Sequence, residues 1–290
     1  MHVVRFRKRP KVAFASVIGP SHLKSGLPNQ DSYACYHSDE FLAMAVADGL
    51  GSAPHSEIGA SFATHLAVQH LSAYLYNYGK PDAKIKDATT LRRRILDAWT
   101  NRFQPNQNKY DTTLLFVGWR PDVCIIGQIG DGLILYRRIP EGEFAAFQEP
   151  TKQYLNDLGC SMARSDAIGL LQVKEYEIST LEDYDSFVLM TDGVADDLID
   201  APRYSNELLG GLCEPPTECW NDKLNKHLAE WPTPGHYDDK TLLVATTVHQ
   251  SRGNKVADVD PPKTGPTRDR SNSTEGSPSS QALPPREDIA

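Results

Sequence analysis

Short apolar runs alternate with polar breaks along roughly the first 250 residues, and most runs are closed by Gly, Asp or Pro. Eight of them are rich in β-branched and aliphatic residues, which is typical of β-strands. They occupy residues 11–19, 41–49, 112–119, 123–132, 133–138, 171–178, 187–193 and 241–248. The pattern predicts a domain rich in sheet.

Three further segments have the spacing of amphipathic helices. Their apolar faces consist of Ile58, Phe62, Leu66, Leu71 and Leu75; of Leu91, Ile95, Trp99 and Phe103; and of Trp220, Leu224 and Leu228. The order is strands, two helices, a run of strands, a helix and a strand, so strand and helix do not alternate. This order favours an α+β fold with antiparallel sheets over a doubly wound parallel sheet. No repeat of fixed period occurs, which disfavours solenoids and propellers.

The apolar pattern stops before the C-terminus. Residues 250–290 contain few large apolar side chains and no aromatic ones. Such a segment cannot bury enough surface to offset its ordering entropy. We therefore expect one domain at residues 1–249 and a disordered polar tail at residues 250–290.

Charge and cysteine content exclude several classes of protein. The net charge is −8, and the tail's six acidic and six basic residues cancel, so the domain holds the acidity. An acidic domain argues against nucleic-acid binding, and we interpret the basic residues 5–9 as a solvated arm. The five cysteines form no CxxC pair, and no apolar signal segment or membrane span is visible. We expect a soluble, cytoplasmic monomer that binds no membrane.

Carboxylates recur at the ends of the predicted strands. The pairs are Asp48-Gly49, Asp131-Gly132 and Asp192-Gly193, and Asp238-Asp239 directly precedes the last apolar run. Any one Asp-Gly pair is explained by a hairpin turn without any chemistry. Strand ends of an antiparallel sandwich gather at two rims, however, and carboxylates on one rim repel each other unless a cation lies between them.

The chemistry of the ligands narrows the choice of cation. Carboxylate oxygens without His or Cys favour Mg²⁺ or Mn²⁺ over zinc. A calcium site is the alternative from these residues alone, although the EF-hand loop pattern is absent. A pair of such ions can lower the pKa of a bound water and hold a phosphoryl group during in-line attack.

Six motifs in sequence order carry a family resemblance. They are SHLKSGLPNQDS, VADGLGS, DTTLLFVG, IGDG, LMTDGVAD and DDKTLLVAT. Over residues 12–248 the chain resembles the PP2C (PPM) phosphatases, most of all a bacterial subgroup of short, divergent members. The resemblance implies a four-layer α-β-β-α sandwich with two central antiparallel sheets flanked by helices. It also implies a metal-dependent serine/threonine protein phosphatase that uses two or three Mg²⁺ or Mn²⁺ ions and whose phosphoprotein substrate is linked to a Ser/Thr kinase.

The resemblance also assigns the central acids. Asp48 matches the aspartate that bridges two metals, and Gly49 matches the glycine whose carbonyl completes the second metal site. Asp192 and Asp238 match ligands of the first metal. Asp48, Asp192 and Asp238 are therefore the residues that the resemblance implies for catalysis.

Three further acids match less central positions. Asp131 matches the acid that, with Asp192, holds a third and weaker metal in bacterial relatives. Asp31 matches the acid beside the second metal, where we expect it to orient the metal's ligands. Asp239 fills a position that is often Asn or Asp, and we treat it as secondary to its neighbour.

Two departures from the family pattern concern capture of the substrate phosphate. Gly26 stands where relatives commonly carry a phosphate-binding arginine, and Lys24 or His22 is the candidate replacement. Leu50 stands where better-studied eukaryotic relatives carry a histidine that is a candidate general acid. His22 and His55 are possible substitutes for it, with an ordinary hydrogen-bonded or solvent-facing histidine as the alternative.

The expected reaction is hydrolysis of phosphoserine or phosphothreonine by a hydroxide that bridges the metals. No covalent phosphoenzyme is expected, because no cysteine lies in a Cys-x5-Arg loop. The absence of a Walker loop argues against a nucleotide-driven kinase or ATPase. A narrower form of the same chemistry is a switch phosphatase for an anti-anti-sigma-like regulator. The alternative from another class is a catalytically weak or inactive PP2C-like pseudophosphatase that binds phosphoproteins. The intact acids argue against it, and the missing arginine keeps it open.

Overall fold

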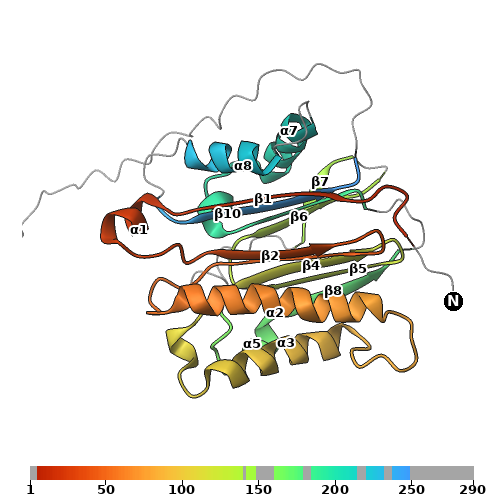
Figure 1. Cartoon of the computed structure of the whole chain (residues 1–290), viewed down its shortest axis with the longest axis horizontal. Helices are drawn as coiled ribbons and strands as arrows, with labels where there is room; N and C mark the ends of the chain where they lie inside the picture. The colour runs from red at the N-terminus through yellow and green to blue at the C-terminus, as the bar shows by residue number, and fades with distance from the viewer. Residues whose placement is uncertain are drawn as a thin grey trace, which may run out of the picture.

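Two antiparallel sheets, stacked face to face, form the centre of the computed structural model (Figure 1). The structure describes residues 5–139, 142–147, 160–178, 184–213, 220–231 and 237–248. The polar tail expected at residues 250–290 lies outside the described residues.

Each sheet has five strands, and neighbouring strands run antiparallel. The first sheet has the order β1 (Lys11–Val17), β10 (Lys240–Thr246), β9 (Ser186–Met190), β6 (Leu133–Arg137) and β7 (Phe144–Ala146). The second has the order β2 (Ser32–His37), β3 (Leu42–Ala47), β4 (Leu114–Arg120), β5 (Val123–Ile129) and β8 (Gln172–Glu177).

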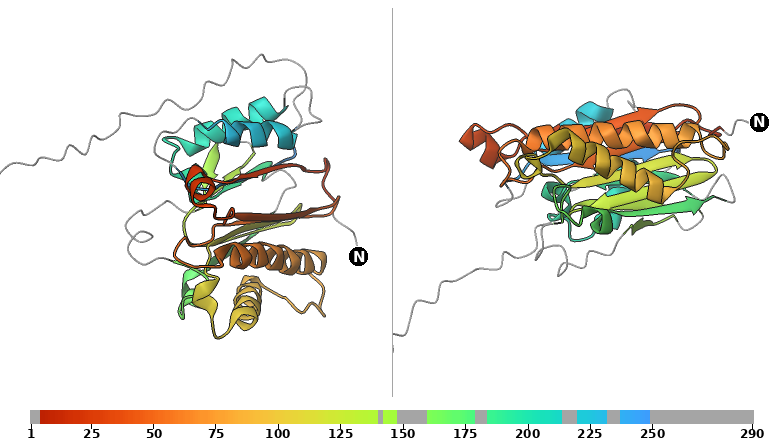
Figure 2. Two further views of the ribbon diagram at one scale, coloured as in Figure 1. Left: turned by 60° about the vertical axis from the view of Figure 1, so that its left-hand side comes forward. Right: turned by 90° about the horizontal axis from the view of Figure 1, so that it is seen from below.

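Helices cover the outer face of both sheets (Figures 1 and 2). On the second sheet lie α2 (Ser56–Tyr76) and α3 (Ala88–Phe103), and on the first lie α7 (Ala201–Cys213) and α8 (Trp220–Ala229). The shorter elements are α1 (Pro20–Ser25), η1 (Gln107–Lys109), α5 (Ala167–Leu170) and α6 (Asp192–Ala195). This arrangement confirms the α+β class and the four-layer sandwich.

The central strands are apolar on both faces, which explains their continuous apolar runs. In β10, Leu243 packs between the two sheets, whereas Leu242 packs under α7 and α8. Three layers of core result: one between α2–α3 and the second sheet, one between the sheets, and one between the first sheet and α7–α8. None of the helices in the described part of the chain combines the length and the apolar character that crossing a bilayer requires.

The structure differs from the sequence prediction at several elements. β2, β7 and α7 were not predicted; β2 is partly exposed, β7 has three residues, and α7 contains Pro202 and two glycines that obscure its pattern. Ile58, predicted on the buried face of α2, is 46% exposed. Gly59, which has no side chain, instead lies directly against the backbone of Tyr110, so α2 packs closely at this point.

Candidate metal centre

The strand-end acids lie at one end of the sandwich. β3 ends immediately before Asp48, β9 ends two residues before Asp192, and β10 begins two residues after Asp238. β9 and β10 are antiparallel neighbours, with Met190 opposite Leu242, so the C-terminal end of one meets the N-terminal end of the other. The same geometry places the start of β2 beside the end of β3, because Ser32 pairs with Ala47.

None of the three Asp-Gly pairs forms a two-residue hairpin. Asp48 precedes the loop to α2, and Asp192 is the first residue of α6. Asp131 lies between β5 and β6, which belong to different sheets. It is flanked by Gly130 and Gly132 at φ 90° and 92°, a conformation that favours glycine. The turn explanation is therefore insufficient for these acids.

Asp48, Asp131 and Asp192 form one group, with carboxylate oxygens that lie within 4.8 Å of one another. The backbone of Asp48 is held firmly: its N–H donates to Thr113 Oγ1 at 2.9 Å, and its carbonyl accepts from Thr112 Oγ1 at 2.8 Å. Asp192 Oδ1 accepts from the next N–H in the chain at 2.7 Å. These hydrogen bonds hold Asp48 and Asp192 in place.

Burial and mutual repulsion raise the pKa values of these acids. Burial is the main cause of the raised pKa of Asp48, followed by the charges of Asp31 and Asp192. Burial also raises the pKa of Asp192 to about 7, with the charges of Asp131 and Asp238 next in importance. The pKa of Asp131 is raised by desolvation and then by nearby acids. A divalent cation at this position would remove the repulsion.

Asp31 carries the clearest sign of a missing partner. It is 8% exposed, and its Oδ2 accepts from Thr191 Oγ1 at 2.7 Å. Its Oδ1 is buried and has no hydrogen-bond donor unless one of the Asp31 and Asp48 carboxyls is protonated. Burial raises the pKa of Asp31 to about 7. A buried, unpartnered carboxylate oxygen is costly, and hard cations bind such oxygens, so these residues fit a divalent ion.

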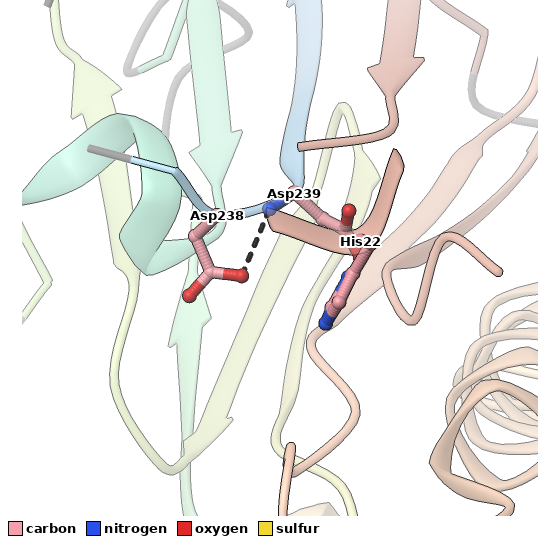
Figure 3. Close-up of side chains that lie close together, drawn as sticks. All are labelled: His22, Asp238 and Asp239. Carbon is pink, nitrogen blue, oxygen red and sulfur yellow. Dashed lines mark hydrogen bonds and ion pairs between the residues drawn. The ribbon is translucent and has the colours of Figure 1, made fainter. Parts of the chain in front are cut away.

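His22, Asp238 and Asp239 form a second group (Figure 3). Asp239 is buried, and both of its carboxylate oxygens are used: Oδ1 accepts from Gly19 N–H at 2.7 Å, and Oδ2 accepts from Gln30 N–H at 2.6 Å and from His22 Nδ1 at 2.8 Å. Asp238 is exposed, and its Oδ1 accepts the Asp239 N–H at 2.8 Å. Figure 3 shows the two aspartate side chains pointing in different directions. Asp239 therefore links the start of β10 to the segment around α1, while Asp238 remains available as a metal ligand.

A cavity of about 390 Å³ joins the two groups. It is lined by Ser21, His22, Gln30, Asp48, Gly49, Gly51, Tyr237 and Asp238. At Gly49 a Cβ atom would lie 2.7 Å from Ser56 Cβ and 2.9 Å from the Gln30 carbonyl oxygen, so only glycine fits without a shift. Gly49 forms an isolated β-bridge with Thr112. The hydrogen bonds of this bridge run from the Thr113 N–H to the Asp48 carbonyl and from the Leu50 N–H to the Asp111 carbonyl, so they do not use the Gly49 carbonyl.

The candidate phosphate-binding residues are placed unequally. His22 lines the cavity, whereas Lys24 is exposed two positions further along α1 and does not line it. Gly26 ends α1 in the left-handed conformation, at φ 73°. His55 precedes α2, and its ring lies against that of Tyr110, with centroids 5.5 Å apart and the planes tilted by 33°. Of the two histidines considered, the structure brings only His22 to the cavity.

The sequence interpretation missed three contributors to this site. Thr191 supplies the hydrogen bond to Asp31, and Gly19 supplies an N–H to Asp239. Tyr237 lines the cavity and is 59% exposed. Thr191 and Tyr237 had a local signal, since Thr191 directly precedes an Asp-Gly pair and Tyr237 directly precedes Asp238-Asp239. The role of Gly19 depends on a contact between distant segments.

Comparison with known proteins identifies the fold. A family model described as protein phosphatase 2C matches residues 18–231. No curated protein matches the sequence significantly. Among solved structures, a bacterial serine phosphatase is 16% identical with a TM-score of 0.58, covering 85% of this chain and 99% of its own. A magnesium complex of RsbX is 14% identical with a TM-score of 0.52, with the same two coverages of 85% and 99%.

A third solved structure is larger than this chain. The C. elegans sex-determining protein is 15% identical, with a TM-score of 0.60 over 82% of this chain. The match spans 65% of that protein's length. At these identities the likeness to solved structures shows only a shared fold. Membership of a family rests on the family model, which matches residues 18–231.

Proposed function

The chain belongs to the protein phosphatase 2C family, and we propose that it is an active, metal-dependent phosphatase that hydrolyses phosphoserine and phosphothreonine in proteins. The observation that supports this most is the group of Asp48, Asp131 and Asp192 within 4.8 Å, next to the unpartnered Oδ1 of Asp31. Four acids in such a small volume are unfavourable without a cation. The substrate would come from a Ser/Thr kinase, the class of enzyme that makes these esters.

We take the roles of the metal ligands from the family resemblance, and the geometry is compatible with them. Asp48 belongs to the group with Asp131 and Asp192 and also lines the cavity with Asp238, so it would hold both of two Mg²⁺ or Mn²⁺ ions, and the Gly49 carbonyl would contribute to one of the sites. Asp192 and Asp238 are proposed as ligands of the other ion, and Asp131 with Asp192 as the place for a third. When bound, such ions activate a water molecule and neutralise charge on the phosphoryl group. Asp31 is proposed to orient this ligand set through its bond to Thr191.

The protein's own contribution to phosphate capture is assigned to His22. An ionised carboxylate only accepts hydrogen bonds, so His22 Nδ1 donates to Asp239 Oδ2 and the opposite nitrogen remains for the cavity. When it carries a proton, that nitrogen can donate to a phosphoryl oxygen. Lys24 lies about 200° further around α1, because each residue of an α-helix turns by about 100°. His22 is therefore the better of the two candidates.

We propose that residues 1–249 form the phosphatase domain. β10 pairs with both β1 and β9, so the first sheet needs residues from both ends of this range. The family model covers its central part.

One observation favours the second candidate, a pseudophosphatase that binds phosphoproteins without turnover. Gly26 is committed to ending α1, so no arginine reaches the phosphate from that position. The acids around Asp48 argue for activity all the same, because a protein that only binds phosphate has no need for clustered carboxylates.

The test is Mn²⁺-dependent hydrolysis of a phosphothreonine peptide and of p-nitrophenyl phosphate. Asp192→Asn should lower the rate by about 100-fold or more, since it removes a proposed metal ligand. Asp82→Asn, at an exposed acid on the loop before α3, is the matched control and should leave the rate unchanged. Peptide binding without hydrolysis by the wild type would establish the pseudophosphatase instead. Equal rates for wild type and Asp192→Asn would refute the assigned centre.

A further inference from the structure

Helix α1 projects from the end of the sandwich at which the acids gather (Figures 1 and 2). None of its six residues is buried. Its Leu23 is 64% exposed, and Leu27, just beyond its end, is 47% exposed. Two exposed leucines, one on this helix and one just after it, in a segment that contributes nothing to the three core layers, call for a separate explanation.

Although α1 is exposed, hydrogen bonds anchor it to the rest of the protein. Ser21 donates to the Tyr237 carbonyl twice, from its N–H at 3.0 Å and from its Oγ at 2.6 Å. The Leu27 N–H donates to the His22 carbonyl at 3.0 Å and closes the helix. Tyr237 is itself 59% exposed. The exposed apolar residues of this anchored segment are Leu23, Leu27 and Tyr237, which is joined to α1 through Ser21; together they are here called the α1 surface.

The α1 surface is continuous with the cavity of the metal centre. Ser21, His22 and Tyr237 line the cavity, and Leu23 follows His22 directly. An extended peptide advances about 3.3–3.6 Å per residue, and α1 is about 9 Å long. Residues one to three positions from a phosphorylated side chain in the cavity therefore lie within reach of the α1 surface.

The chemistry of this end of the molecule selects the occupant. Asp48 and Asp238, the acids proposed to hold metal, line the cavity, so a phosphorylated side chain would enter there and the residues that flank it would pass over α1. The exposed apolar side chains of the described residues along that path are Leu23, Leu27 and Tyr237. We propose that the α1 surface binds an apolar side chain flanking the phosphorylated Ser or Thr of the protein substrate. This inference rests on the proposed phosphatase function and adds a substrate preference to it.

The test compares substrates that have flanking residues with one that has none. The peptides place a single leucine at each position from three before to three after phosphothreonine, on a Gly-Ser background, and p-nitrophenyl phosphate serves as the flank-free substrate. For the wild type, at least one leucine position should raise kcat/KM by about tenfold or more, the range that burying a leucine side chain supplies. The Leu23→Ser/Leu27→Ser variant should lose that preference and keep its kcat/KM for p-nitrophenyl phosphate.

Ile139→Ser is the matched control. Ile139 is 41% exposed and follows the far end of β6, away from the Asp131 turn. This variant should behave as the wild type on every substrate. Proportional losses on all substrates in the α1 variant, or a leucine preference that survives it, would overturn the inference.

Two other occupants give different results, and both would overturn the proposal. A second copy of the chain would appear as a dimer by light scattering that the double variant makes monomeric. A segment of residues 249–290 would appear as a gain in peptide kcat/KM when those residues are removed. If the wild type hydrolyses nothing, the proposed function fails, and the inference is tested by binding of fluorescent forms of the same peptides. Equal affinity of wild type and double variant would then refute it.

Discussion

Two adjacent aspartates at the metal centre should respond in opposite ways to the same chemical change. Asp239 is 1% exposed and accepts hydrogen bonds from Gly19, Gln30 and His22. Asp238 is exposed and accepts only a local N–H through its Oδ1. Changing either to asparagine preserves size and shape. We expect Asp239→Asn mainly to lower the free energy of unfolding and Asp238→Asn mainly to lower kcat.

The magnitude follows from the bonds to Asp239. A hydrogen bond to a charged group contributes about 1.5–3 kcal/mol, and a buried group left unpaired costs a similar amount. Asparagine has one oxygen for three donors, and its NH₂ group would face an N–H. Asp239→Asn should therefore lower the free energy of unfolding by about 2–4 kcal/mol. Asp238→Asn, at an exposed side chain, should change it by less than about 0.5 kcal/mol.

Urea unfolding in EDTA measures the free energy of unfolding without metal. The initial rate of p-nitrophenyl phosphate hydrolysis with Mn²⁺ measures catalysis. Asp238→Asn should lower kcat about 100-fold, as loss of a metal ligand does at least as much as loss of its supporting contacts. The reasoning is refuted if Asp239→Asn unfolds at the wild-type urea concentration, or if Asp238→Asn is the destabilised variant. Either result would exchange the roles of the two acids.

Two further predictions follow from burial at the same site. The pKa of Asp31 is raised from 3.8 to about 7, so the folded state binds the Asp31 proton more tightly than the unfolded state does. The stabilisation that this proton provides is fully present below about pH 4 and is lost as the pH rises through about 7. The melting temperature in EDTA should fall between pH 5 and pH 8, and Mn²⁺ should raise it more at pH 8. Asp31→Asn should weaken both dependences without abolishing them, because the pKa of Asp192 is also raised to about 7. A pH-independent melting temperature in the wild type would contradict this. At Gly193 a Cβ would collide with the Asp239 carbonyl, so Gly193→Ala should cost about 2 kcal/mol or more in urea unfolding. Gly211→Ala, where nothing lies within 4 Å in α7, is the control and should be neutral or stabilising.

The layered core could be predicted from the sequence because its central strands are buried on both sides. All eight predicted apolar runs overlap a strand, and in a central strand such as β10 Leu242 and Leu243 alike are excluded from water on opposite faces of one sheet. β2 and α7 escaped prediction because their sequences carry weak signals. β2, SYACYH, contains no Val, Ile or Leu, and α7 contains Pro202 and two glycines, so contacts with the rest of the fold decide both elements.

The position of the acids could also be predicted from the strand pattern, while the different roles of Asp238 and Asp239 could be inferred only from the family resemblance. Strand ends fix where Asp48 and Asp192 lie. Whether Asp238 or Asp239 faces the cavity depends on the N–H groups of Gly19 and Gln30, which are more than 200 residues away in sequence. No local pattern records that contact. In their contacts, the two adjacent acids therefore become distinguishable only once the first strand pairs with the last.

Gly26 links the loss of the arginine that the family resemblance implies to the local structure of α1. At φ 73° this position favours glycine, and a larger residue would cost about 1–2 kcal/mol there, so restoring an arginine would strain the turn that ends α1. The same turn places Leu27 in solvent and brings its N–H to the His22 carbonyl. The position at which the resemblance implies a phosphate-binding arginine is thus occupied by the glycine that ends a short helix. We therefore expect phosphate capture and substrate selection to depend on α1, through a histidine held by a buried carboxylate and through the exposed leucines beside it.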